Sequence, residues 1–160
     1  MIALGIDPGT RRIGYGVILA QKSEAVFIEA GILPVTSTDD VSALYETKKA
    51  LDKLITKHKP DVLAVEKLFF AKNRTTALAV AQARGVILLA AREHNVLVRE
   101  YAPNEVKAGV TGYGAADKKA VLKMVRFILK QPGLSVIDDA SDALALAIIG
   151  SASPLIHTND

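Results

Sequence analysis

The stretch IALGIDPGTRRIGYGVIL, residues 2–19, decides the fold. Its two apolar parts, residues 2–7 and 13–19, are rich in Ile, Val and Leu, and a turn-forming Asp-Pro-Gly-Thr motif that begins at Asp7 separates them. A third segment with strand-like composition follows at residues 25–35. Three strands joined by such short connections predict an antiparallel meander.

After the meander, the hydrophobic period changes from that of a strand to that of a helix. Apolar residues recur at three- and four-residue intervals over residues 39–58, with Thr38 or Asp39 as the N-cap and Pro60 as the stop. The elements expected next are a strand, a helix, a strand and two helices, at residues 61–66, 74–94, 96–101, 117–130 and 138–151. Strands separated by helices imply parallel crossovers. The order predicts an α/β, ribonuclease-H-like fold: a five-stranded mixed sheet, three antiparallel strands and then parallel ones, flanked by helices.

Length and composition exclude several classes of protein. No linker or repeat divides the 160 residues, so we expect a single ribonuclease-H-like domain at residues 1–153 and a short C-terminal tail at residues 154–160. The absence of cysteine excludes a disulfide framework, thiolate zinc sites and a cysteine nucleophile. The longest apolar run, residues 143–149, is far shorter than the roughly 18 residues of a membrane span, and the N-terminus lacks the basic region of a signal peptide. We therefore expect a cytoplasmic protein with no membrane partner.

The charge balance is mildly basic, with a net charge of +3 and a pI near 9.1. Such a balance suits a nucleic-acid partner, but it is also common among proteins that bind none. Many of the basic residues lie in the later part of the chain, whereas the acidic residues of most interest lie where predicted strands end.

Four carboxylates are candidate catalytic residues. Asp7 and Glu66 end predicted strands, and sites in open sheets form outside the carboxyl ends of parallel strands. Asp139 and Asp142 are three residues apart and share a face of the last helix. Four clustered carboxylates repel one another unless cations neutralise them, and oxygen ligands favour Mg²⁺ or Mn²⁺. Two such ions, about 3.5–4 Å apart, are suited to hydrolysing a phosphodiester bond.

Each acid also has an ordinary structural interpretation. Asp7 is a common first residue of a turn, and Glu66 at a strand end is often simply solvated. Asp139 and Asp142 would complement the dipole of the helix in its first turn. Asp138 and Asp142 share a helix face as well, so spacing does not choose between Asp138 and Asp139, although Asp138 is the better N-cap candidate.

The chain resembles the RuvC family of bacterial Holliday junction resolvases over nearly its whole length. The segments that carry the resemblance are GIDPGTRRIGYGV at 5–17, AVEKLFFAKN at 64–73, AQARGV at 81–86, Val-Lys at 106–107 and DASDALALAI at 139–148. It implies a homodimer with two Mg²⁺ or Mn²⁺ ions per active site, held by Asp7, Glu66, Asp139 and Asp142. It also implies paired symmetric nicks in four-way junction DNA that leave 5′-phosphate and 3′-hydroxyl ends, and cooperation with the RuvA–RuvB branch-migration complex.

The resemblance further implies which residues contact DNA. Phe69 matches an aromatic residue that stacks on unpaired bases, and Lys107 and Lys118 match basic residues that face the DNA. Three more basic residues are candidate phosphate contacts by proximity alone: Lys119, Arg74 and Lys72. The chain departs from familiar members at Lys67 and at Phe70, which leaves open whether it shares their sequence preference at the cut.

Parts of the sequence also fit three other functions. Actin-like kinases and ATPases carry a phosphate loop similar to Asp7-Pro-Gly-Thr10, but they need two such domains around a nucleotide. A related ribonuclease-H-like nuclease that processes RNA is the closer alternative, and a binding module that has lost catalysis is the third. The presence of all four acids argues against lost catalysis, and Phe69, Lys107 and Lys118 favour junction DNA over RNA.

Overall fold

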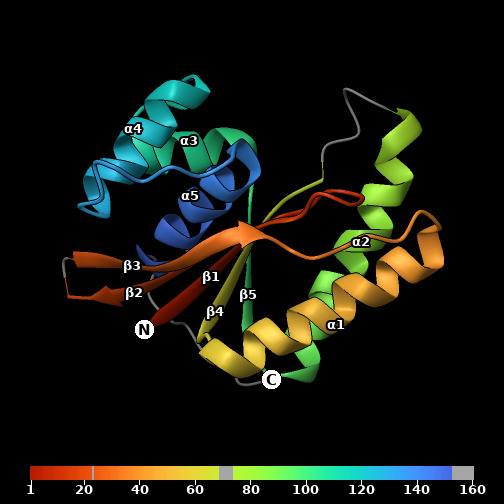
Figure 1. Ribbon diagram of the computed structural model, residues 1–160. Helices are drawn as coiled ribbons and strands as arrows, with labels where there is room; N and C mark the ends of the chain where they lie inside the picture. Colours follow the sequence, from red (N-terminus) through yellow and green to blue (C-terminus); the bar gives the residue numbers. More distant parts are fainter. Residues whose placement is uncertain (23, 69–73, 153–160) are drawn as a thin grey trace.

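The structure is a computed structural model that describes residues 1–22, 24–68 and 74–152, with the backbone alone at positions 74 and 75 (Figure 1). The tail expected at residues 154–160 lies outside the described residues. Among the helices described, none is both long and apolar enough to cross a membrane.

A five-stranded mixed sheet forms the centre of the chain. β1 (Ile2–Asp7), β2 (Gly14–Gln21) and β3 (Glu24–Ile32) make the antiparallel meander, and β4 (Val62–Glu66) and β5 (Leu97–Tyr101) continue the sheet as parallel strands beyond β1. The strand order is β3-β2-β1-β4-β5. The predicted mixed sheet is therefore confirmed.

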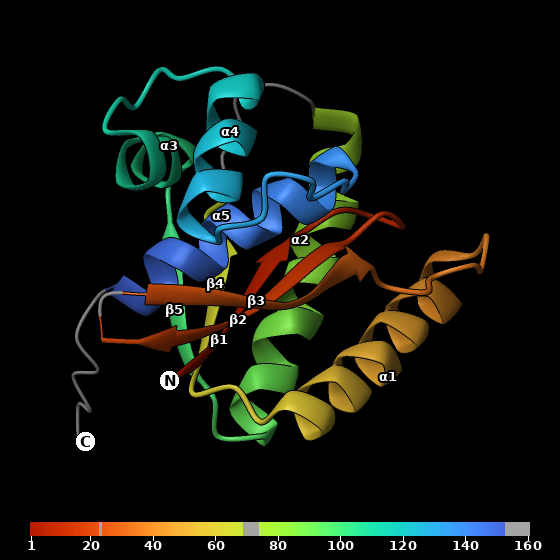
Figure 2. The same cartoon turned by 60° about the vertical axis from the view of Figure 1, so that its left-hand side comes forward.

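Helices cover both faces of this sheet (Figures 1 and 2). α1 (Asp40–His58) and α2 (Arg74–Glu93) pack on one face, and α5 (Asp138–Ala152) packs on the other. α3 (Pro103–Thr111) and α4 (Lys118–Ile128) lie against the side of α5 that faces away from the sheet. Two hydrophobic clusters result, one on each face of the sheet.

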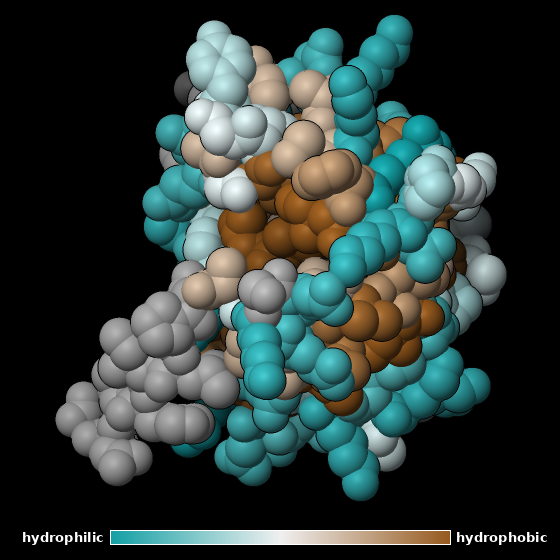
Figure 3. Space-filling view, turned by 90° about the vertical axis from the view of Figure 1, so that its left-hand side faces the viewer, coloured by the Kyte–Doolittle hydropathy of each residue, from teal (hydrophilic) through white to brown (hydrophobic). Residues whose placement is uncertain are grey.

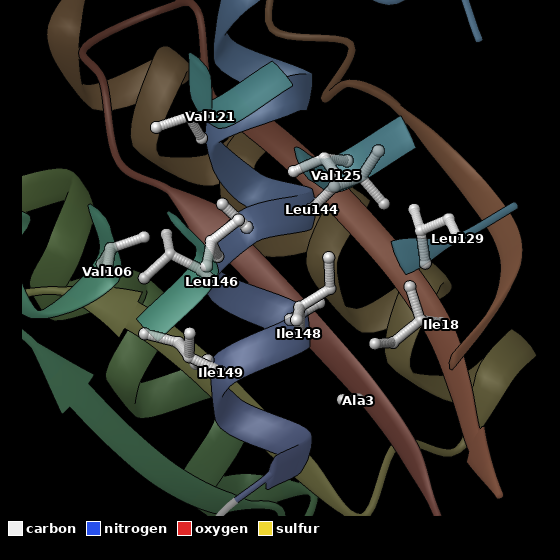
Figure 4. Packing of buried hydrophobic residues seen from close by; sticks show 14 of the residues in the cluster. Ala3, Ile18, Val106, Val121, Val125, Leu129, Leu144, Leu146, Ile148 and Ile149 are labelled. Atoms are coloured by element: carbon white, nitrogen blue, oxygen red, sulfur yellow. The ribbon is translucent and has the colours of Figure 1, made fainter. Parts of the chain in front are cut away.

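α5 is a core helix. All its residues from Ala143 to Gly150 are buried, because the sheet lies on one side of it and α3 and α4 on the other. A helix that is apolar all round is stable only when it is enclosed in this way. Figure 4 displays part of this packing, with labelled side chains from β1, β2, α3, α4 and α5.

Glycines let α5 approach the sheet. A Cβ atom on Gly5 of β1 would lie 1.9 Å from the carbonyl oxygen of Ala143, and one on Gly14 of β2 would lie 2.0 Å from that of Asp139. Real Cβ atoms do not come this close to backbone, so only glycine fits at these two positions. The first turn of α5 is thus held directly over the strand next to Asp7.

Both ends of α1 agree with the sequence expectation. The Asp39 carboxylate accepts a hydrogen bond from the backbone N–H of Ser42, 2.9 Å away, so Asp39 is the N-cap. Lys59 ends the helix in the left-handed conformation, and Pro60 follows it.

Two expectations were wrong. The sequence analysis predicts no element between residues 101 and 117, but α3 occupies residues 103–111. Its nine residues bury only Val106 and Val110, which is too short a pattern to reveal a helical period. Asp138 was favoured as an N-cap, but it is the first helical residue of α5, and the backbone oxygen of Ile137 accepts the first helical hydrogen bonds.

Candidate active site

The four acids come from three separate elements and meet at one edge of the sheet. β1 and β4 are adjacent and parallel, with Ile6 paired to Val65, so Asp7 and Glu66 end neighbouring strands at the same edge. Asp7 also pairs with Gly14, over which the backbone of Asp139 lies. The close approach of α5 to the sheet therefore brings its first turn to Asp7.

The electrostatics of Asp7 reflect this arrangement. Burial and the negative charges of Asp142, Glu66 and Asp139 raise the pKa of Asp7 from 3.8 to about 7. Burial and Asp142 also raise the pKa of Glu66. All four predicted acids thus act on a common region, in which adding negative charge is costly and a cation is favoured.

Two cations already lie against this region. The Arg12 guanidinium donates hydrogen bonds to Oδ2 of Asp139 from Nη2, at 2.7 Å, and from Nε, at 3.1 Å. The Lys118 Nζ donates to Oδ2 of Asp142 at 3.2 Å. The charge of Lys107 on α3 acts on Glu66 and opposes the rise of its pKa.

The donor set suits a hard divalent cation, because it consists only of carboxylate oxygens. Within the described residues, however, no three acidic or histidine side chains already converge as a metal-binding group. The hydrogen bonds of Asp139 to Arg12 and of Asp142 to Lys118 account for this, since each directs a carboxylate oxygen toward a protein cation. A metal ion at the cluster would compete with Arg12 and Lys118 for Oδ2 of Asp139 and Oδ2 of Asp142.

The structure also distinguishes Asp139 from Asp138. Asp139 is among the acids that raise the pKa of Asp7. The Asp138 side chain is 77% exposed, and its nearest cation is Lys118, with 3.8 Å between Oδ2 and Nζ. The placement favours Asp139 as the third acid of the cluster.

The predicted DNA contacts fall into two groups. Lys107 lies on α3, and its charge acts on Glu66. Lys118 and Lys119 are the first two residues of α4, and both line a hollow that Asp142 also lines. Arg74 is the first residue of α2, where the backbone alone is described. Phe69 and Lys72 lie outside the described residues.

Arg12 was missed in the sequence. It lies in the connection between β1 and β2, only five positions after Asp7, inside the segment that decides the fold. Its closeness in sequence to Asp7 could have marked Arg12 as a candidate partner of the acids. The contact with Asp139 was not predictable, because it joins residues 127 positions apart through the path of an irregular loop.

Asp7 should make the metal-free protein less stable at high pH. The unfolded chain releases the Asp7 proton near pH 3.8, whereas the folded chain holds it up to about pH 7, so the free energy of unfolding falls as pH rises between these values. The scale is about 1.4 kcal/mol for each pKa unit. The Asp7→Asn variant does not lose stability in this way, because asparagine does not titrate. Urea unfolding of both proteins in chelator should give a stability difference in favour of the variant that is larger at pH 8 than at pH 5, and an equal difference at both would contradict the assignment.

Comparison with known proteins agrees with this fold. Residues 3–150 match the family described as crossover junction endodeoxyribonuclease RuvC. The RuvC protein of Fusobacterium nucleatum is 42% identical over the whole of this chain and 87% of its own length, and that of Heliobacterium modesticaldum is 45% identical over 92% of each.

Solved structures of RuvC proteins are also similar to this chain. The Thermus thermophilus RuvC structure superimposes with a TM-score of 0.87 at 29% identity, covering 94% of this chain and 93% of that one. The same values hold for T. thermophilus RuvC solved in complex with a Holliday junction substrate. The chain therefore belongs to the RuvC family of crossover junction endodeoxyribonucleases.

Proposed function

We propose that this chain resolves Holliday junctions by cutting phosphodiester bonds at the cluster formed by Asp7, Glu66, Asp139 and Asp142. The observation that carries the proposal is the convergence of these acids on Asp7, whose pKa of about 7 reflects its burial and the charges of the other three acids. Relatives covering the whole chain bear the name of this activity, and the structure of one of them contains a Holliday junction.

The four acids would hold Mg²⁺ or Mn²⁺. Two such ions held there would supply a lower pKa for an attacking water and a positive charge beside the leaving 3′ oxygen, and the products would carry 5′-phosphate and 3′-hydroxyl ends. The chain supplies the arrangement. Asp7 is fixed by β1 and its pairing with β2, and Glu66 is fixed at the end of β4. The rigid helix α5 sets the distance between Asp139 and Asp142.

Arg12 and Lys118 have two states in this proposal. Without metal they neutralise Asp139 and Asp142, which reduces the mutual repulsion of the acids. A metal ion bound by the same carboxylate oxygens would leave both side chains free beside the site, where the phosphates of DNA offer new partners. Both are long and largely exposed, so the exchange needs no movement of the backbone.

Removing Arg12 should make metal binding tighter. Arg12→Met leaves Asp139 without its competing cation, and an exposed ion pair contributes about 0.2–1 kcal/mol, which corresponds to an increase of up to roughly fivefold in Mn²⁺ affinity. Calorimetric titration of Mn²⁺ into DNA-free protein measures this. The matched control is Arg11→Met, because Arg11 bonds to Ser37, Thr38 and Asp40 instead. Weaker Mn²⁺ binding by Arg12→Met would contradict the competition.

The DNA contacts proposed for the chain are Phe69, Lys107, Lys118, Lys119, Arg74 and Lys72. Lys107 and Lys118 are supported by their electrostatic action on the acids, beside which the phosphate to be cut would lie. Phe69 is proposed as a stacking residue on unpaired bases, a contact worth roughly 1–3 kcal/mol. Its replacement by alanine should impair cutting more than binding.

A homodimer fits both the substrate and the surface of α2. A two-fold axis would place one site on each of two symmetry-related strands of a junction. On the outer side of α2, Leu78 and Leu89 are 70% and 54% exposed, and Gly85 between them has open space in front of its Cα. We propose this face of α2 as the dimer contact, and the RuvA–RuvB complex as the partner in branch migration.

The test of the function is cleavage of defined substrates. Synthetic four-way junctions, linear duplex and RNA hairpins are incubated with the purified protein, with and without Mg²⁺ or Mn²⁺, and the nicks are mapped. The expected result is a symmetric pair of nicks in the junction alone, ligatable and dependent on metal. Cutting of the RNA hairpins with an intact junction would support the RNA-processing alternative.

A further inference from the structure

A row of basic side chains runs along the outer surface of α4. Lys119, Lys123 and Arg126 follow one another at intervals of four and three residues, which places them on one side of the helix, and Lys130, just beyond the helix end, lines the same groove. We call these four residues the α4 stripe. From Lys119 to Arg126 the helix rises about 10 Å, so the stripe extends along more than one nucleotide of a DNA strand.

The α4 stripe borders a groove of about 700 Å³. Its other lining residues are Leu122, Phe127 and Pro132, and the described lining contains no acid. The Phe127 side chain is 76% exposed. On the side of the molecule that carries α4, apolar surface and hydrophilic side chains lie next to one another (Figure 3). Cations interleaved with an exposed aromatic ring are typical of a groove that follows a nucleic-acid strand.

The groove is continuous with the acidic cluster. A smaller hollow of about 260 Å³ is lined by Lys118, Asp138, Ser141 and Asp142, and it shares Lys119 and Leu122 with the larger groove. The N-terminal end of α4 therefore borders the candidate active site, and the rest of the helix leads away from it. A strand that passes the acids would meet the α4 stripe next.

Two cations of the stripe remain available for a ligand. Lys130 pairs with Glu24 at 2.6 Å, and Arg126 donates to the backbone oxygen of Leu134. In the part of the chain that the structure describes, Lys119 and Lys123 have no such ion pair. Two uncompensated lysines one helical turn apart attract a polyanion, and phosphates are the ligands that best satisfy exposed lysines of this kind.

We infer that the groove along α4 binds the sugar–phosphate backbone of the junction arm that leaves the active site, with Lys119 and Lys123 as its phosphate contacts. This inference rests on the proposed function, which supplies the DNA. It adds a binding surface that extends away from the acids, and it assigns Leu122 and Phe127 to the floor on which the strand lies.

Replacing the two lysines should weaken junction binding and its dependence on salt. The double variant Lys119→Met/Lys123→Met is compared with the parent by fluorescence anisotropy on a labelled four-way junction in chelator, at several salt concentrations. We expect affinity to fall roughly tenfold or more. The negative slope of log K against log salt should become shallower by roughly 1.8, because each phosphate contact contributes about 0.9.

The matched control is Lys49→Met/Lys53→Met. These lysines have the same spacing and are exposed on α1, which packs on the opposite face of the sheet, so the variant removes the same charge elsewhere. It should bind with a slope within about 0.5 of the parent's, on the scale of 0.9 for one contact. Equal losses in both double variants would mean that net charge alone acts, and the inference would fail.

A second measurement reports position instead of affinity. The chain contains no cysteine, so Lys123→Cys provides a single thiol. Junctions that carry a tether ending in a mixed disulfide with a small thiol, attached to one backbone phosphate at increasing distance from the crossover, should exchange with the thiol at position 123 at one narrow range of positions, which crosslinks the DNA and releases the small thiol. Lys49→Cys should form no crosslink.

The outcomes separate the inference from the proposed function. A parent that does not prefer the junction over duplex contradicts the proposed function itself. A parent that binds and cuts the junction, together with a Lys119→Met/Lys123→Met variant of unchanged affinity and slope and no crosslink at position 123, overturns the inference alone. In that case the groove is left for an acidic peptide of a partner protein.

Discussion

Asp7→Asn is expected to reduce the rate of junction cutting by at least about a thousandfold while leaving junction binding in chelator unchanged. Asparagine has the shape of aspartate but not its charge, and Asp7 is the residue on which the charges of the other three acids act. A thousandfold loss corresponds to about 4 kcal/mol of transition-state stabilisation, well within what metal ions supply in such sites. Single-turnover cutting and anisotropy binding of the same junction measure the two quantities.

The same result is expected for Glu66→Gln, Asp139→Asn and Asp142→Asn. Asp138→Asn is the matched control, since Asp138 is next to Asp139 in sequence but its side chain is mostly exposed and faces Lys118. It should cut at a rate within a few-fold of the parent's. If an acid variant loses binding along with cutting, the role of that acid is structural, and if it still cuts, the acid is not part of the site.

Gly5→Ala should be the most destabilising single methyl group that can be added to this chain. The new Cβ would lie 1.9 Å from the oxygen of Ala143 and 2.6 Å from the nitrogen of Ala147, and neither backbone atom can move without shifting α5. Overpacking of a core costs about 1–3 kcal/mol and occasionally more. We expect a loss of about 3 kcal/mol or more, which in a domain of this size lowers Tm by roughly 6–12 °C.

Gly14→Ala tests whether the same close approach builds the site. Its Cβ would meet the carbonyl of Asp139 at 2.0 Å, so the variant should displace the first turn of α5 and lose cutting even where it remains folded. Gly133→Ala is the control for both, because it adds the same methyl group in a turn with nothing within 4 Å. That change should raise stability by about 0.4–1 kcal/mol, because alanine reduces the conformational entropy of the unfolded chain. Unfolding by heat or urea, with cutting assays on the folded fraction, distinguishes these outcomes.

Much of the fold was predictable because its signals are local. Alternating Ile and Leu before Asp7, the turn motif after it and the switch to a helical period near Asp39 each lie within a few residues. Once the strand order is known, the parallel pairing of β1 with β4 brings Asp7 and Glu66 to the same edge of the sheet. The acids at strand ends could therefore be proposed from the sequence.

Of the features that were missed, α3 has a weak local pattern, and the other two depend on contacts between distant segments. α3 was overlooked although Pro103 lies at its first position and Glu105 accepts a hydrogen bond from the N–H of Ala102 at 2.6 Å, which are ordinary start signals in a segment with little hydrophobic period. The pairing of Arg12 with Asp139 depends on the path of the loop between β1 and β2. The choice of Asp139 over Asp138 depends on the angle at which α5 meets the sheet, which no spacing reveals.

The position of α5 in the chain has a consequence during synthesis. Asp7 leaves the ribosome among the first residues, but its partners Asp139 and Asp142 follow only after more than a hundred others. They belong to the helix that completes the hydrophobic cluster on one face of the sheet, whereas the cluster on the other face contains no residue of that helix. A ribosome-bound chain can therefore form the second cluster early, but it lacks the first cluster and the group of four acids until α5 emerges.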